Sequence, residues 1–511
     1  MTRFTPALTA PALTVWALAA TALVSPVSAF AAGTLTVAQP QDPGSWDPID
    51  TFVVNWSTVA ENVFDGLIRR TPDMKLVPGL ATSWEVRENN TKIRFKLREG
   101  VTFHNGEKFD ASVVKYSFER LLGPEGAKGP QQSNYNAIGS VEIIDANTVD
   151  LVLKRADPVL LTKLAGYGAM MVPPKYIAEK GEDFFNANPV GTGPFKMTAY
   201  EPKVNVTLER FDGFWGDKAK LDKVIHRFIA EPATASAELQ AGRVDIFDNV
   251  PVSLVPTIAK DPKLTVASVT GPTVNAARFN TQQGIAKDVN VRKALIMAVD
   301  RDTIVKQILQ GHAKSIVSFQ ADISFGYDPA LKAVPFDPKT AKELLTKAGV
   351  KPGTELQFDI RGSDATFREV AQAVAGYLQA VGIKVNLKPY ETNVLINEII
   401  PKGKAGEMYQ NAWGGWTFDY DNTAYLMYHT GEHWNANYSN PKIDALLEAQ
   451  RATYDVAVRE KTLREVAAAV ADEALEIPLY NLNTIYGVSK RVKGFVPPSD
   501  RRFRLNEVTV D

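Results

Sequence analysis

The 511-residue chain has no cysteine, only five histidines and no excess of either charge. The lack of cysteine excludes disulfides, a thiol nucleophile and thiolate metal ligands, so stability has to come from burial of the core. Lys and Arg number 57 and Asp and Glu 58, which gives a formal net charge of −1. Such a balance does not favour nucleic acid or an anionic membrane surface as a partner. We therefore expect a small or neutral partner.

Long apolar runs are also missing, except at the N-terminus. Arg3 precedes an apolar run from Ala7 to Val24, and the small residues Ala29 and Ala31 fit the cleavage site of a secretory signal peptide. A membrane-spanning helix is the alternative, but the run is short and interrupted. We predict that residues 1–31 are a cleavable signal peptide and that the mature protein is soluble and periplasmic. Without cysteine it is not a lipoprotein.

The rest of the chain alternates between strand-like and helix-like segments, which is typical of α/β domains. With 45% hydrophobic and 23% charged residues, the composition suits a globular protein of two to four domains. Apolar periodicity and capping residues predict a strand over Thr34–Ala38, helices over Trp56–Leu67, Val291–Leu309 and Thr366–Val381, and a helix that starts at Asn440-Pro441.

One short motif suggests an enzyme. His429, Glu432 and His433 spell H-x-x-E-H, the inverted zinc-peptidase motif. That motif needs both histidines on one helical face, yet Gly431 in its middle costs a helix about 1 kcal/mol relative to alanine. The residues from 434 to 441 have no helical period either. We predict a loop here and keep a zinc metallopeptidase only as a distant alternative.

Several longer motifs point elsewhere. Gly79–Glu85, Leu97–Val114, Asn188–Phe195, Leu239–Asp245 and Tyr438–Pro441 follow one another in a recognisable order. Together they resemble the signature of the dipeptide/oligopeptide class of ABC-transporter extracellular solute-binding proteins, solute-binding protein family 5. The motifs that carry this resemblance extend over most of the mature chain.

The resemblance implies an α/β, two-lobed periplasmic-binding-protein fold, type II-like and of the large class with an extra subdomain. The ligand cleft would lie between the lobes, and closure about a hinge would trap the solute. The protein would be a monomer without catalysis or cofactor. It would deliver a peptide-like ligand to ABC permease subunits of the inner membrane, which work with cytoplasmic ATPase subunits. By analogy, lobe I comprises 32–75, 185–280 and 480–511, the extra subdomain 76–184 and lobe II 281–479, with hinge strands near Ala277–Asn280 and Ile477–Asn481.

The resemblance also implies a ligand site. In relatives with a W-x-x-D-Y pattern, the aspartate accepts the α-ammonium group of the ligand, and Trp416 to Tyr420 match that pattern. The ammonium role therefore falls on Asp419. Trp413 and Trp416 flank two glycines, which mark a loop whose backbone can approach a ligand closely. The expected ligand-binding residues are Trp413, Trp416, Thr417, Phe418, Asp419, Tyr420 and Asp421, with Trp56, Asn280 and Arg361 as further candidates, Arg361 for a ligand carboxylate.

The sequence departs from the family pattern just after this loop. Asp421 to Leu426 lacks the proline common in relatives and is one residue shorter. A different pocket wall leaves the ligand class open between a peptide, which we favour, and an oligosaccharide, an opine or a metal chelate.

Overall fold

The computed structural model describes residues 1–2, 33–51 and 53–511. The predicted signal peptide thus lies almost entirely outside the described residues, and so does its cleavage site. Residues Gly33–Asp511 form one compact unit. Over the residues that are described, no helix is long and apolar enough to cross a membrane.

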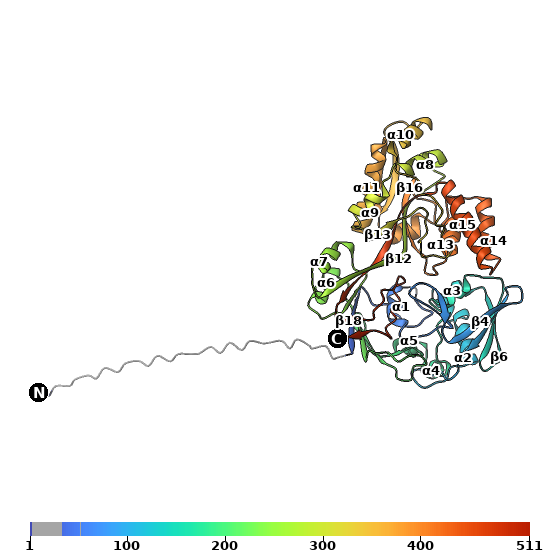
Figure 1. The fold of residues 1–511 in the computed structure, drawn as a ribbon, viewed down its shortest axis with the longest axis vertical. Coiled ribbons are helices and arrows are strands. Elements are labelled where there is room, and N and C mark those ends of the chain that lie inside the picture. Colours follow the sequence, from blue (N-terminus) through green and yellow to red (C-terminus); the bar gives the residue numbers. More distant parts are fainter. Residues whose placement is uncertain (3–32, 52) are drawn as a thin grey trace. The chain divides into compact units, whose positions relative to one another are not determined.

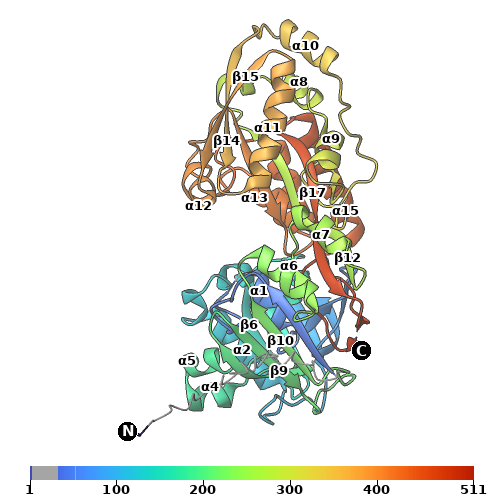
Figure 2. The ribbon, with the colours of Figure 1, turned by 90° about the vertical axis from the view of Figure 1, so that its left-hand side faces the viewer.

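An 11-stranded sheet runs through this unit in the order β15-β14-β16-β12-β17-β11-β1-β10-β9-β8, with β13 paired to β17. Two of its strands, β12 (Leu264–Phe279) and β17 (Glu476–Ser489), connect two groups of elements, as Figure 2 shows. We call residues 33–263 and 490–511 lobe I, and residues 280–475 lobe II. Each lobe has buried hydrophobic clusters of its own.

Lobe I contains the N-terminal half of the sheet and a separate subdomain (Figure 1). Its elements are β1 (Thr34–Gln39), α1 (Val54–Ala60), β2 (Ile68–Arg70), β3 (Leu76–Pro78), β4 (Ala81–Arg87), β5 (Lys92–Leu97), α2 (Ala111–Leu122), β6 (Ile138–Asp145), β7 (Thr148–Leu153), α3 (Leu160–Leu164), α4 (Pro174–Lys180), α5 (Glu182–Ala187), β8 (Phe195–Glu201), β9 (Asn205–Arg210), β10 (Lys223–Phe228), α6 (Pro232–Gln240), β11 (Ile246–Asp248), α7 (Val255–Ala259), β18 (Val492–Lys493) and β19 (Thr509–Val510).

Lobe II surrounds the other half of the sheet with helices. Its elements are α8 (Val289–Met297), α9 (Arg301–Gln307), β13 (Ala313–Ser315), α10 (Pro338–Lys347), β14 (Thr354–Arg361), α11 (Ala365–Ala380), β15 (Ile383–Tyr390), α12 (Thr392–Val394), β16 (Met408–Gly414), α13 (Tyr420–Tyr428), α14 (Pro441–Arg451) and α15 (Val456–Asp472). Strands β15, β14 and β16 run parallel, so their carboxyl ends share one edge of the sheet. In α/β sheets this edge is where ligands bind.

The pairing of β12 with β17 is irregular in two places. The register shifts between Thr270 and Val274, around Gly271-Pro272, and again between Asn275 and Ala276. Before the first shift β12 pairs only with β17, whereas from Thr273 to Phe279 it also pairs with β16 of lobe II. The first shift lies several residues before the predicted hinge segment Ala277–Asn280, whereas the second adjoins it. The predicted hinge and domain boundaries stay predictions.

The subdomain of lobe I follows from a period-two pattern. Ile93, Phe95 and Leu97 of β5 are buried, whereas Lys92, Arg94 and Lys96 between them are not. The buried face packs into a cluster that includes Phe118 of α2, and the sheet order is β4-β5-β7-β6. This sheet lies within residues 76–184, where the extra subdomain is predicted.

Two of the predicted helices are confirmed and two are wrong in length. The helices at Thr366–Val381 and Asn440-Pro441 are confirmed as α11 and α14, and the Asn440 side chain accepts from Lys442 N at 3.0 Å. The helix predicted over Val291–Leu309 is wrong in length, because Asp300 caps a second helix and splits the segment into α8 and α9.

The helix predicted over Trp56–Leu67 is too long as well, since α1 ends at Ala60. The carbonyl oxygens of Asn62 and Val63 accept hydrogen bonds from Phe195 and Gly193 instead of from the next helical turn. A tertiary contact thus ends the helix where the periodicity would continue it.

The core of lobe I contains a histidine that should make stability pH-dependent. His226 of β10 is 0% exposed, and its Nδ1 lies 3.1 Å from Gln39 Oε1. Burial lowers its pKa to about 3. Between that value and the unfolded value near 6.5 the unfolded chain binds the extra proton, so stability falls as the pH falls. We expect His226 to contribute a loss of up to about 1.4 kcal/mol per pH unit below pH 6.5.

Urea unfolding at pH 7, 6 and 5 measures this slope. His226→Gln should flatten it, whereas His433→Gln, at an exposed histidine, should leave it unchanged. An identical slope in His226→Gln and wild type would contradict the assignment.

Candidate functional site

The predicted ligand loop lies between β16 and α13. Three contacts fix its path: Phe325 N donates to Phe418 O at 2.9 Å, Tyr420 N donates to Phe325 O at 3.0 Å, and the Asp419 carboxylate accepts from Asp421 N at 3.0 Å. The last contact makes Asp419 the N-cap of α13. The loop is therefore a strand-to-helix turn at the carboxyl edge of the sheet, as a ligand site of an α/β sheet requires.

Asp419 itself has a partner within the protein. Arg459 of α15 donates from Nη1 to Oδ2 and from Nη2 to Oδ1, each at 3.0 Å. Asp419 is 4% exposed and Arg459 5%. Burial raises the pKa of the Asp419 carboxyl, and the Arg459 guanidinium opposes that change. The carboxylate is thus enclosed and paired within the protein, and the ammonium role expected from the sequence stays a prediction.

Asp421 is used in the same way. Arg451 donates to its two oxygens at 2.7 and 2.9 Å, and Gln450 Nε2 also donates to Oδ1. The guanidinium of Arg451 lies over the Tyr425 ring, 3.2 Å from its centroid. Asp421 therefore joins α13 to α14 and has no open charge for a solute.

Trp416, Thr417 and Phe418 face lobe I. Arg70 of β2, which is 2% exposed, donates from Nη1 to Trp416 O at 3.1 Å and from Nη2 to Thr417 O at 3.2 Å. Its guanidinium lies 5.1 Å from the centroid of the Phe418 ring. Burial and the nearby Arg502 lower the pKa of Arg70 to about 10. We call this contact between β2 and the loop the Arg70 contact.

The Trp416 ring enters the surface of lobe I. It lies edge-on to Tyr167, with ring centroids 6.0 Å apart, and it covers Gly166, where a Cβ atom would overlap the indole. Glycine is therefore needed at position 166 for the two lobes to meet here. The Trp56 ring also contacts Tyr167, with ring centroids 6.0 Å apart.

Three further candidates are buried in the structure. Trp56, Asn280 and Tyr420 are each 1% exposed. Trp56 Nε1 donates to Trp46 O, and Asn280 Nδ2 donates to Ala405 O. Tyr420 belongs to a core cluster of lobe II. Each side chain packs inside its own lobe. The ligand contacts expected of these residues from the sequence stay predictions.

Arg361 and Trp413 keep donors without partners. Arg361, at the carboxyl end of β14, donates from Nη2 to Ala412 O at 3.3 Å and lies over the Phe367 ring, but its Nε has no hydrogen-bond partner. Burial lowers its pKa. Trp413 packs against Trp434, and its Nε1 also has no partner. Of the ten predicted residues, these two combine an edge position with an open donor.

A cavity of about 340 Å³ lies where the subdomain of lobe I meets α13 and α14. A pocket of this size suits a small ligand. Its charged lining side chains are Arg155, Asp157, Lys163, Asp421, Glu432 and Arg451. Lys163 pairs with Asp157 at 2.7 Å and Arg451 with Asp421, whereas no ion pair to Arg155 or Glu432 is found among the described residues.

The sequence did not single out Arg70, Arg155 or Arg459, because no local pattern marks them.

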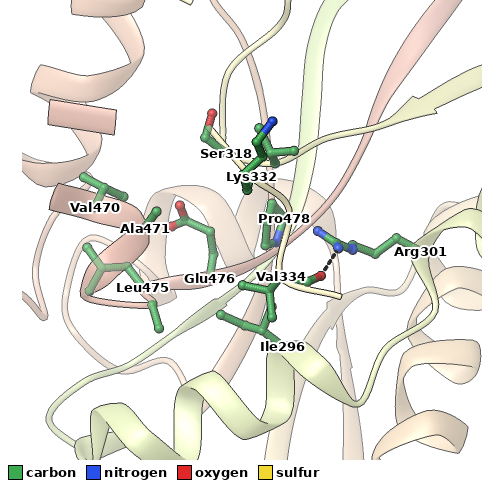
Figure 3. Close-up of a pocket in the computed structure, with 12 residues that line it drawn as sticks. Ile296, Arg301, Ser318, Lys332, Val334, Val470, Ala471, Leu475, Glu476 and Pro478 are labelled. Atoms are coloured by element: carbon green, nitrogen blue, oxygen red, sulfur yellow. Dashed lines mark hydrogen bonds between the residues drawn. The ribbon is translucent and has the colours of Figure 1, made fainter. Parts of the chain in front are cut away.

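A second cavity, inside lobe II, is too small for a solute. Its volume is about 30 Å³, the share of one water molecule in the liquid. Figure 3 shows Glu476, Pro478 and Arg301 around it, with Arg301 bonded to the Val334 carbonyl. Three other cavities, of about 640, 360 and 330 Å³, are each lined by residues of one lobe. The cavity of about 340 Å³ is lined by residues of both lobes.

The residues of the zinc-peptidase motif do not converge. The predicted loop is confirmed: α13 ends at Tyr428, and Gly431 has a φ of +85°. The His429 ring stacks on Tyr425, and its Nε2 lies 3.2 Å from Glu448. His433 contacts Trp434 instead. No group of three or more possible metal-ligating side chains occurs in the part of the chain that the structure describes.

The comparison with protein families agrees with this geometry. The model of the bacterial extracellular solute-binding proteins, family 5, matches residues 75–435. The chain belongs to this family. Solute-binding proteins of family 5 are substrate-binding components of transporters, and the predicted resemblance and two-lobed fold are confirmed.

Among curated relatives, the chain is 26% identical to the dipeptide-binding protein of Escherichia coli over 86% of each chain. It is also 26% identical to the glutathione-binding protein GsiB of Salmonella paratyphi A, over 96% of this chain and 98% of that protein. Among solved structures, the periplasmic binding protein DppA of Helicobacter pylori in complex with the peptide STSA superposes with a TM-score of 0.76. The identity is 25%, with 94% of this chain and 98% of that chain covered.

Proposed function

We propose that this family 5 protein is the periplasmic receptor of an ABC importer and that it binds a peptide between its lobes. The observation that carries the proposal is the cavity of about 340 Å³ lined by side chains of both lobes. Two strands, β12 and β17, connect those lobes, which suits closure about a hinge. The names of the dipeptide-binding and glutathione-binding relatives favour a short peptide over other solutes.

The remaining parts of the proposal follow from the same role. The receptor is a monomer that is secreted by its signal peptide and cleaved before Ala32. It releases the solute to permease subunits in the inner membrane, which are powered by cytoplasmic ATPase subunits. It binds and releases the peptide without cleaving it.

A thermal-shift screen tests the ligand class. The protein, freed of bound solute by unfolding and refolding, is heated with di-, tri- and tetrapeptides, oligosaccharides, opines and metal chelates. A ligand at 100 times its dissociation constant adds about 2.7 kcal/mol to the free energy of unfolding. We expect peptides to raise the melting temperature. A rise with sugars, opines or chelates, and none with peptides, would overturn the peptide assignment.

Arg361 is the predicted contact for the carboxylate of the peptide. Its Nε–H is free at the carboxyl edge of the sheet, and a guanidinium recognises a carboxylate through paired hydrogen bonds. We expect Arg361→Met to weaken binding of peptides with a free C-terminus by about tenfold or more and to leave C-terminally amidated peptides unaffected. Calorimetric titration of both peptide forms measures this. Arg368→Met, at an exposed arginine on α11, is the control. Equal losses for both peptide forms would argue against the carboxylate contact.

A further inference from the structure

A tyrosine of lobe II reaches lobe I at the edge of the cavity between the lobes. Tyr454 lies in the turn between α14 and α15, and Figure 1 shows these helices above α3 of lobe I. The Tyr454 hydroxyl donates to Asp157 O at 2.8 Å, and the ring packs against a hydrophobic cluster of lobe I residues. Asp157 N in turn donates to the hydroxyl oxygen at 3.4 Å. The tyrosine therefore joins the two lobes through both its polar and its apolar part.

The lobe I side of this contact is held by its own hydrogen bonds. Asp157 precedes α3, where its Oδ1 accepts from Val159 N at 3.2 Å and its Oδ2 pairs with Lys163 at 2.7 Å. Asp157 O also accepts from Leu160 N at 2.9 Å. Since the side chain is used inside lobe I, the backbone of Asp157 makes the contact with lobe II. Tyr454 is therefore the partner that can be changed without disturbing α3.

The lobe II side of the contact is fixed as well. Asp455, the next residue, caps α15, because its Oδ1 accepts from Val458 N at 3.0 Å. Asp455 N donates to Thr453 Oγ1 at 3.0 Å. Burial raises the pKa of the Tyr454 hydroxyl, so the phenol keeps the proton that it donates. A turn of fixed shape thus carries the donor, and little conformational freedom is lost when it meets lobe I.

This contact is separate from those of the ligand loop. Trp416 packs against a different hydrophobic cluster, the one that contains Tyr167. Asp157 lines the cavity between the lobes, whereas Tyr454 is not among the described residues that line it. Tyr454 thus joins the lobes from beside the cavity.

We propose that Tyr454 is a clasp that holds the two lobes together through contacts of the protein itself. The inference rests on the proposed function only in that closure of the lobes serves solute binding. A contact that forms only when the lobes meet favours the closed conformation whatever the solute is. One hydrogen bond of this kind changes such an equilibrium about twofold to tenfold. Loss of the clasp should therefore weaken binding of every solute by the same factor.

The lack of cysteine in the chain makes the closing equilibrium measurable. Glu85→Cys on β4 and Lys461→Cys on α15, both at exposed side chains, place a donor and an acceptor dye in different lobes. Single-molecule energy transfer on the mature protein, freed of solute by unfolding and refolding, then reports the ratio of closed to open molecules. Tyr454→Phe, which keeps the ring, should lower this ratio about twofold to tenfold. Tyr454→Ala, which also loses the ring, should lower it further.

The matched control is Tyr176→Phe. The Tyr176 hydroxyl also donates to a backbone carbonyl, that of Asn188, but both residues belong to lobe I. This control should keep the wild-type ratio. A wild-type ratio in both Tyr454 variants would overturn the clasp, and so would a wild-type protein without closed molecules.

The clasp and the proposed function fail separately. If Tyr454→Phe opens the lobes as expected while no peptide of the thermal-shift screen stabilises wild type, the clasp stands and the peptide assignment fails. If peptides stabilise wild type while the ratio of closed to open molecules is unchanged in both Tyr454 variants, the receptor assignment stands and the clasp fails.

Discussion

Replacing Asp419 with asparagine should lower the free energy of unfolding by about 3–5 kcal/mol, because removal of one partner leaves the other charge buried and unpaired. Arg459 is 5% exposed, and its other partners, Gln450 and the Phe325 ring, are neutral. Asparagine caps a helix about as well as aspartate, but the variant also removes a negative charge that the dipole of α13 favours at its N-terminus. Chemical denaturation of the unliganded protein measures the loss.

The matched control for this variant is Glu465→Gln. Glu465 lies on α15, the helix that carries Arg459, but its ion pair with Lys461 is exposed and 3.9 Å long. Exposed pairs contribute little, so the control should change stability by less than about 1 kcal/mol. If Asp419→Asn instead kept the stability of wild type and lost the preference for peptides with a free α-amine, that result would favour the ligand role expected from the sequence.

Replacing Gly166 with alanine should weaken ligand binding by roughly tenfold to a hundredfold. The new methyl group would overlap the Trp416 indole and push it out of lobe I. Overpacking of this kind costs about 1–3 kcal/mol, and each 1.4 kcal/mol is a factor of ten in affinity. This overlap destabilises the conformation in which the lobes meet. The Arg70 contact would be lost together with the Trp416 contact.

Calorimetry with a peptide identified in the screen measures this effect, and small-angle scattering reports the separation of the lobes. Gly376→Ala is the control, since a Cβ atom at this position on α11 meets nothing within 4 Å. Trp416→Ala removes the same contact without overpacking and should also weaken binding. Wild-type affinity in both Gly166→Ala and Trp416→Ala would show that the Trp416 contact has no part in closure.

The elements that could be predicted from the sequence are those with local causes. Helix α14 starts at Asn440 because the side chain caps it, and α11 has an unbroken apolar stripe, so both were found. Helix α1 was predicted too long because its end depends on Phe195 and Gly193, which lie more than 130 residues further along the chain. Periodicity carries no information about such a contact.

The site shows the same division. A loop was predicted around Gly414 and Gly415 because glycines mark such turns. The structure has Trp413 and Gly414 at the end of β16, and the turn follows from Gly415 to Asp419. The partner of Asp419 was not foreseeable, because Arg459 is 40 residues away on another helix and no local pattern marks it. The burial of Trp56 and Asn280 likewise depends on tertiary packing. Glu432 was noticed for its motif, but its open carboxylate is a property of the folded cavity.

The central claim is that the chain binds a peptide by closing its two lobes and releases it intact. Small-angle scattering of the refolded mature protein, combined with mass spectrometry of the peptide after incubation, tests both parts at once. The account predicts a smaller radius of gyration at saturating peptide and quantitative recovery of the uncleaved peptide. An unchanged radius of gyration with peptide bound, or peptide cleavage that Glu432→Ala abolishes, would contradict it.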